Sequence, residues 1–145
     1  MREVVATING YDMYPRIVGR VRFQQCKRGV LVTAHIRNLP TDGFFAFHIH
    51  EGNNCEEPQG HYNPNGALHP YHAGDLPPLL SNGGEAYMSV LTDRFTLDAI
   101  IGRTVIIHKN PDDFRTQPSG DSGDRVACGV IMPSCSNPRF FCERF

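Results

Sequence analysis

Apolar and polar residues alternate along several short stretches of this chain, the pattern of β-strands with one buried face. In residues 16–23, for example, Val21 and Phe23 share one face and Arg20 and Arg22 take the other. On such patterns the sequence predicts eight strands, over residues 4–8, 16–23, 29–36, 44–50, 85–91, 95–99, 102–108 and 126–132. No stretch has a convincing helical period. We therefore expect an all-β fold, an eight-stranded Greek-key sandwich or barrel.

Two long stretches interrupt this alternation. Residues 51–84 show no period and are rich in Gly, Pro, Asn and His, and residues 109–125 are rich in Asp, Gly and Pro. Long loops without secondary structure of their own are uncommon in compact domains. We expect something other than a hydrogen-bonded ladder to order the first of them.

Composition narrows the class of protein. The 145 residues fit one domain, and a net charge of −1 argues against a nucleic-acid partner. No apolar run is long enough for a membrane span. The apolar start of the chain is followed at once by Asn9-Gly10, so it is typical of a strand and not of a signal peptide. The expected location is cytoplasmic if Met1 is the true start, and periplasmic or extracellular if a leader was removed.

The candidate chemistry lies in the histidines, six of which fall between residues 48 and 108. His48 and His50 share one face of the predicted strand 44–50, about 7 Å apart along it, so their imidazoles can converge on one metal. The alternative is two surface histidines on an edge strand. His108 ends another strand and can join a site built on a neighbour. His35 has no partner at a useful spacing, and we interpret it as structural.

A denser group follows in the first loop. His61, His69, His72 and Asp75 lie within fifteen residues and are a plausible set of tetrahedral zinc ligands. A structural zinc would also order a loop with few apolar residues, because metal binding supplies folding free energy. The alternative is a flexible loop that happens to carry histidines.

Taken together, six segments resemble the copper–zinc superoxide dismutases of the short-looped bacterial type. The segments are 47–51 (FHIHE), 60–64 (GHYNP), 72–77 (HAGDLP), 101–108 (IGRTVIIH), 111–114 (PDDF) and 123–131 (GDRVACGVI). They occur in the family's order and make residues 1–132 one domain of this kind, which leaves 133–145 as a C-terminal tail. The resemblance implies a Greek-key β-sandwich, for which this family is an example.

The resemblance also implies the roles of single residues. The implied copper ligands are His48, His50, His61 and His108, and the implied zinc ligands are His61, His69, His72 and Asp75. His61 would bridge one copper and one zinc ion per chain. Asp112 matches the carboxylate that hydrogen-bonds His48 and His69. Cys55 and Cys128 match the family's intrasubunit disulfide.

The implied activity is dismutation of superoxide to O₂ and H₂O₂, with catalytic roles for His61 and Arg125. Arg125 matches the arginine that guides and holds the anion, and Lys109 is a weaker candidate for steering. The resemblance leaves a homodimer possible. The alternative function is a zinc- or copper-binding module without turnover. A zinc hydrolase is disfavoured because four protein ligands would close the zinc site. In the tail, Cys135 and Cys142 could pair with each other or stay free.

Overall fold

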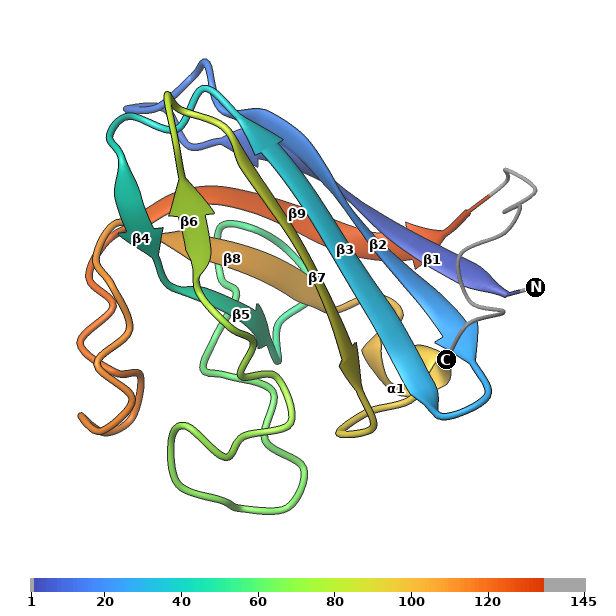
Figure 1. Cartoon of the computed structure of the whole chain (residues 1–145). Coiled ribbons are helices and arrows are strands. Elements are labelled where there is room, and N and C mark those ends of the chain that lie inside the picture. Colours follow the sequence, from blue (N-terminus) through green and yellow to red (C-terminus); the bar gives the residue numbers. More distant parts are fainter. Residues whose placement is uncertain (1, 135–145) are drawn as a thin grey trace.

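The computed structural model describes residues 2–134 and shows an all-β protein with one short helix (Figure 1). Its elements in chain order are β1 (Glu3–Gly10), β2 (Val18–Cys26), β3 (Gly29–Arg37), β4 (Gly43–Phe45), β5 (Phe47–His50), β6 (Leu79–Ser81), β7 (Ala86–Thr92), α1 (Leu97–Ile100), β8 (Thr104–His108) and β9 (Arg125–Pro133). Within residues 2–134, no helix has the length and apolar character needed to cross a bilayer.

The strands form a curled antiparallel sheet that nearly closes on itself. Seven strands pair in the order β5-β8-β9-β1-β2-β3-β7, and β4 pairs with β6 in a separate ladder. β4 runs into β5 with only Ala46 between them, and β6 leads into β7 through a turn bridged by Asn82 and Glu85. The β4–β6 pair therefore links the two ends of the larger sheet, as in a barrel.

Alternation along the strands fills the interior of this barrel. Phe23 of β2, Ile36 of β3, and Phe47 and Ile49 of β5 are completely buried and belong to one continuous apolar core. Burial of side chains of this size supplies roughly 1.5–3 kcal/mol each, which is the main stabilisation of the fold. Since successive side chains of a strand point to opposite faces, the residues of β5 that alternate with Phe47 and Ile49 project from the outer side of the barrel.

The predicted fold class is confirmed, but three local predictions were wrong. Residues 95–99 do not form a strand: Thr96 caps α1 by accepting a hydrogen bond from the Ala99 backbone N–H, and this short helix buries Leu97 and Ile100. The predicted strand 44–50 is interrupted at Ala46. Strand β6 was missed because three residues between Pro and Asn are too few to show a period.

The last strand ends close to where the sequence predicted. Strand β9 continues to Pro133, one residue past the predicted strand 126–132, and the Ser134 backbone N–H donates to the Glu3 carbonyl at 3.3 Å. Most of the predicted tail, with Cys135 and Cys142, lies outside the described residues.

Candidate metal centre

Two histidines are presented by β5 on the outer side of the barrel. His48 and His50 alternate with Phe47 and Ile49, which point into the core. His48 pairs with Ile106 of β8 in the ladder, and a register shift between Ile107 and His108 follows at the end of β8. The register therefore brings His108 to the same outer surface as the two histidines of β5.

The facing nitrogens of His50 and His108 are arranged as metal ligands are. His50 Nδ1–H donates to the Gln59 carbonyl (2.7 Å), and His108 Nδ1–H donates to the Gly123 carbonyl (3.1 Å). Burial lowers the pKa of His50 to about 3 and the pKa of His108 to about 4, so both rings are neutral at pH 7. Each Nε2 then carries a lone pair, yet the two Nε2 atoms are 3.2 Å apart. Two lone pairs at this distance repel unless a cation lies between them.

The first long loop is fastened along the free edge of β5. The Tyr62 backbone N–H donates to the Ile49 carbonyl, and the Ile49 N–H donates to the Gly74 carbonyl, each at 2.8 Å. Gly74 allows this approach, because a Cβ at this position would lie 2.3 Å from the Ile49 oxygen. Bridges between His50 and His61 and between His48 and Asp75 complete the attachment. The loop thereby brings its ligand candidates against the histidines of β5.

The loop residues form a second cluster beside the first. His61 Nδ1 lies 2.8 Å from Asp75 Oδ1 and 3.2 Å from His72 Nδ1. Asp75 Oδ2 lies 3.1 Å from His69 Nδ1 and 3.3 Å from His72 Nδ1. Burial would raise the pKa of Asp75, but the hydrogen bond with His61 and the three imidazoles hold it below its usual value. Nitrogen ligands of a tetrahedral zinc at about 2.0–2.1 Å are roughly 3.3 Å apart, so these distances suit one ion.

In both clusters the candidate ligand atoms lie close enough together to hold one metal ion. The ligand atoms of His48, His50, His61 and His108 all lie within 4.8 Å of one another, and so do those of His48, His61, His69 and Asp75. His72 is outside the second set of mutually close atoms, although it contacts two of its members. His61 belongs to both sets and faces the loop cluster with Nδ1, so the predicted ligand candidates all meet in one region.

The hydrogen bonding at the centre is incomplete in a way that a metal would complete. Within the described chain, His48 Nδ1, His61 Nε2 and His69 Nδ1 are buried side-chain nitrogens that make no hydrogen bond; the 3.1 Å contact of His69 Nδ1 with Asp75 Oδ2 does not have hydrogen-bond geometry. Leaving one such group unsatisfied costs about 1–3 kcal/mol. Three of them at one place fit a centre whose imidazoles ligate cations.

Asp112 connects the two clusters from behind. His48 Nε2–H donates to Asp112 Oδ2 and His69 Nε2–H donates to Oδ1, both at 2.7 Å. The Phe114 backbone N–H also donates to Oδ1. Burial would raise the pKa of Asp112, but these hydrogen bonds outweigh it and hold the pKa well below the ordinary value. The charged carboxylate fixes both rings with their Nδ1 lone pairs turned to the clusters, as carboxylate partners of metal-binding histidines do.

An open cavity of about 830 Å³ gives access to the first cluster. His50, His61, His108 and Arg125 line it. Arg125 begins β9, is exposed, and has its guanidinium carbon 5.7 Å from the centre of the Tyr11 ring. Three carboxylates also line the cavity, from Glu56, Glu57 and Asp124. An anion that enters would therefore meet one arginine among several acidic groups.

A disulfide between Cys55 and Cys128 ties the loop to β9, with the two Cα atoms 5.9 Å apart. The Tyr11 hydroxyl donates to the Cys55 carbonyl at 2.6 Å, which links the same point to the end of β1. Disulfides persist in non-reducing compartments, and the Cys55–Cys128 bond is consistent with such a compartment.

Comparison with known proteins agrees with this geometry. The sequence profile of the family described as copper/zinc superoxide dismutase matches residues 17–131. The chain is 40% identical over 141 residues to the Cu-Zn superoxide dismutase of Legionella pneumophila, an alignment that covers 89% of this chain and 86% of that protein. It is 33% identical over 135 residues to Cu-Zn superoxide dismutase 2 of Aquifex aeolicus, with 79% of each chain covered.

The chain belongs to the copper/zinc superoxide dismutase family. This membership confirms the resemblance drawn from the six sequence segments. Copper and zinc are the metals the family implies, and the two clusters are where the structure offers groups that could hold them.

Two residues that support the metal centre were not predicted from the sequence. Gly120 has a φ of +75°, and a Cβ there would lie 2.0 Å from Asp112 Oδ1. Arg94, just after β7, points Nη1 at the carbonyls of Pro70 (3.1 Å) and His72 (3.3 Å) in the metal-binding loop. A lone Gly or Arg in a loop carries no sequence signal for such a role.

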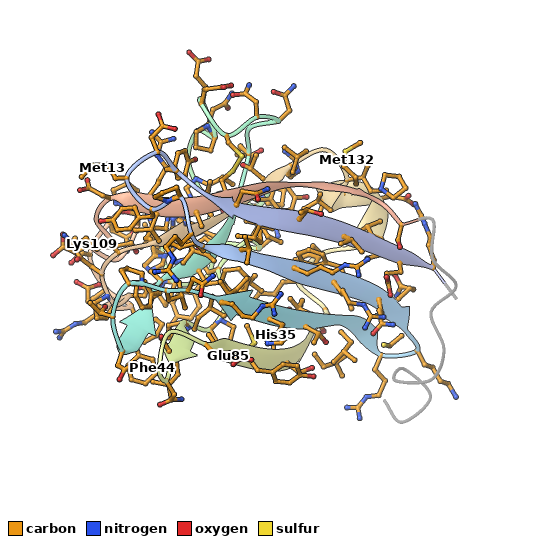
Figure 2. The ribbon with its side chains drawn as sticks, turned by 90° about the horizontal axis from the view of Figure 1, so that it is seen from above. Met13, His35, Phe44, Glu85, Lys109 and Met132 are labelled. Carbon is orange, nitrogen blue, oxygen red and sulfur yellow. A yellow bond between two sulfur atoms is a disulfide. The ribbon has the colours of Figure 1, made fainter. Side chains whose placement is uncertain are left out.

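His35 stands apart from the centre, as predicted, but it is not a core residue. It is exposed on the outer face of β3, and its Nε2 lies 2.6 Å from Glu85 Oε1 (Figure 2).

Proposed function

We propose that this protein dismutates superoxide, with copper bound in the first cluster and zinc in the second. One superoxide loses an electron and leaves as O₂, while another gains that electron and two protons and leaves as H₂O₂. The observation that carries the proposal is His61, which belongs to both clusters: its Nδ1 faces Asp75 and His72, and its Nε2 is buried without a hydrogen-bond partner in residues 2–134. A single imidazole shared by two clusters suits a bridge between two different metals.

The ligand sets we propose are those of the sequence prediction, with one ion of each metal per chain. Copper would be held by His48, His50, His61 and His108, and zinc by His61, His69, His72 and Asp75. His72 is preferred to His48 for zinc because His48 offers only Nδ1 and lies on β5 beside His50. When bound, copper supplies the one-electron chemistry and zinc, which has no redox chemistry, supplies rigidity.

The chain's own residues then act on the anion and the proton. Arg125 at the cavity would attract the superoxide and hold it near His50 and His108. His61 also lines this cavity and would deliver a proton to the nascent peroxide from Nε2. Asp112 keeps His48 oriented throughout, because it accepts its Nε2–H. The Cys55–Cys128 disulfide supports a periplasmic or extracellular location over a cytoplasmic one.

A metal-binding module without turnover is the rival function. The complete first cluster and the presence of Arg125 in its cavity favour the enzyme over that module. The acidic groups around the cavity leave the strength of steering open to measurement, since they oppose Arg125.

The deciding experiment is metal reconstitution followed by metal analysis and a superoxide-consumption assay. We expect one copper and one zinc per chain, rapid consumption of superoxide, and a Cu(II) spectrum that changes when zinc is withdrawn. His61→Ala should abolish that spectral coupling. The control is His35→Ala, at the one histidine that is not a ligand candidate, and it should leave the content of both metals and the rate unchanged. A protein that retains only zinc after exposure to both metals, or that binds both metals without consuming superoxide, would instead be a metal-binding module without turnover.

A further inference from the structure

A group of cationic side chains lies on the outer face of β2 and β3, away from the metal centre. Arg20 pairs in register with His35, and Val18 pairs with Arg37, so Arg20 and Arg37 are diagonal neighbours about 7–8 Å apart. Arg22 lies two residues further along β2, on the same face and about 7 Å away. Three guanidinium groups therefore share one small area of the sheet.

Two of these arginines have no ion pair within the part of the chain that the structure describes. Arg22 pairs with Glu3 at 2.8 Å, and His35 pairs with Glu85. For Arg20 and Arg37, no ion pair is found among residues 2–134. Charge is also divided unevenly along the sequence. Residues 1–40 hold seven Lys or Arg and two Asp or Glu, a net charge of +5, and residues 41–145 carry a net charge of −6. The near-neutral total thus conceals a basic N-terminal segment, whose three strand arginines all lie on β2 and β3.

The face is hollowed where the arginines meet. A depression of about 520 Å³ is lined by Arg20, Arg22 and Arg37 together with hydroxyl-bearing Thr7, Thr33 and Tyr87. Arg20, Arg37, Thr7 and Tyr87 are all exposed, and the Tyr87 side chain stands beside His35 with the ring centroids 5.9 Å apart. Guanidinium forks and hydroxyl groups are the donors that recognise multiply charged oxyanions.

We propose that this hollow binds a tetrahedral oxyanion, a phosphate or sulfate group, through Arg20 and Arg37. An anion placed between them would relieve their mutual repulsion, and the hydroxyl groups around them would complete its hydrogen bonds. Superoxide is too small and too weakly charged to account for a site of this spread, and the metals are held elsewhere.

The position of the hollow leaves the active site open when the anion is bound. In the ladder order β5-β8-β9-β1-β2-β3-β7, the strand β2 lies four places from β5, on the far side of the barrel (Figure 1). If the oxyanion belongs to a surface such as an anionic bilayer, the protein would sit on it through β2 and β3 with the metal cavity turned to solvent. If it belongs to a small solute, the hollow is an additional ligand site.

The test is an NMR titration of the protein loaded with zinc and reduced copper, which keeps the sample diamagnetic. Sodium sulfate replaces sodium chloride at constant ionic strength, so that general screening does not change. We expect saturable shifts of the amides of Thr33, His35 and Tyr87. Shifts confined to the cavity around Arg125, or linear and unsaturable shifts at all basic residues, would overturn the proposal unless the vesicle experiment below shows binding.

Matched variants locate the anion. Arg20→Gln and Arg37→Gln should each weaken sulfate binding by roughly tenfold, because each removes a charge-assisted hydrogen bond. Arg28→Gln makes the same charge change in the turn between β2 and β3, outside the hollow, and should leave sulfate binding unchanged. Superoxide consumption should be equal in all three variants, which shows that they fold. Equal weakening by Arg28→Gln would mean diffuse attraction and would refute the site.

The source of the oxyanion is distinguished with vesicles. Cosedimentation with phosphatidylglycerol vesicles, absent with phosphatidylcholine and lost in Arg20→Gln and Arg37→Gln, would identify a lipid phosphate at a surface. Saturable sulfate binding without cosedimentation would identify a soluble anion. Failure of both measurements would overturn the proposal, and it would leave the dismutase activity untouched.

Discussion

Gly120 lies so close to Asp112 that a Cβ on it would be 2.0 Å from Oδ1 of that carboxylate. The same Cβ would be 2.6 Å from His69 Nε2, so the glycine lies against the hydrogen bond between the two residues. The second long loop can therefore close over the centre only with glycine at this place. Gly120 is not a ligand candidate itself, and its contribution is to the orientation of the ligand candidates His48 and His69 through Asp112.

Gly120→Ala should displace Asp112 and loosen both His48 and His69. We expect zinc affinity to fall roughly 10–100-fold, as for loss of the partner of a metal-binding histidine. Chelator competition measures this. The control is Gly83→Ala: Gly83 also has a positive φ (+62°), but a Cβ there would have nothing within 4 Å. Gly83→Ala introduces the same backbone strain of about 1 kcal/mol, and the variant should keep its affinity for zinc. Equal losses of affinity would show that strain alone matters.

Asp112→Asn tests the charge of the same group with little change of shape. The amide keeps one acceptor oxygen but turns an NH₂ group toward one of the two imidazole N–H groups, so either His48 or His69 loses its partner. We expect metal affinity to drop by about tenfold or more, with the fold intact by circular dichroism. Unchanged affinity for both metals would mean that packing alone orients the rings.

Arg94→Gln tests the clamp on the metal-binding loop. The guanidinium reaches the carbonyls of Pro70 and His72, and a shorter neutral side chain cannot span both. We expect faster amide hydrogen exchange in residues 70–75 and weaker zinc retention, with a loss of about 1 kcal/mol in local stability. Arg115→Gln is the matched control, because Arg115 is exposed and its two hydrogen bonds found in residues 2–134 are both made by its backbone. Identical exchange in both variants would refute the clamp.

Arg125→Ala should lower the rate of superoxide consumption while leaving metal content intact. The side chain lines the cavity and is not itself a ligand candidate, so its loss removes attraction for the anion. We expect a several-fold lower rate, because the carboxylates of Glu56 and Glu57 then face the anion unopposed. Salt screens that repulsion, so the rate should no longer fall as ionic strength rises. Stopped-flow rates at several salt concentrations measure both effects. An unchanged rate would exclude the role proposed for Arg125.

Removal of both metals should release the loop more than the barrel. The strands are held by the core around Phe47 and Ile49, whereas His48 Nδ1 and His61 Nε2 have no hydrogen-bond partner within residues 2–134. We expect amide exchange in residues 60–76 to accelerate strongly and exchange in β2 and β3 to change little. A uniform loss of protection over the whole chain would show that the metals stabilise the barrel itself.

The sequence predicted the class of fold and the region of the site better than it predicted local detail. Alternation in β2 and β3 is strong because each strand has one face in the core. The wrong strand at residues 95–99 arose because Leu97 and Ile100 are buried from a single helical turn, which is too short to show a helical period.

The ligand candidates could be found because six of the seven histidines lie between residues 48 and 108, and two of them are two residues apart on β5. Gly120 and Arg94 could not, since their roles depend on contacts across the fold with Asp112 and with the loop carbonyls. The interruption at Ala46 was invisible for a similar reason. Its backbone N–H leaves the ladder to bond the Asn110 carbonyl, in the other loop.

The attachment of the first loop to β5 has a consequence for association between molecules. A strand edge with free N–H and C=O groups is a template on which another chain can pair. Here the groups of Ile49 are satisfied by Tyr62 and Gly74 of the metal-binding loop. The loop that gathers the histidines thus also shields the free edge of β5. A molecule that loses its metals would uncover that edge, so supply of copper and zinc would determine how readily the protein aggregates.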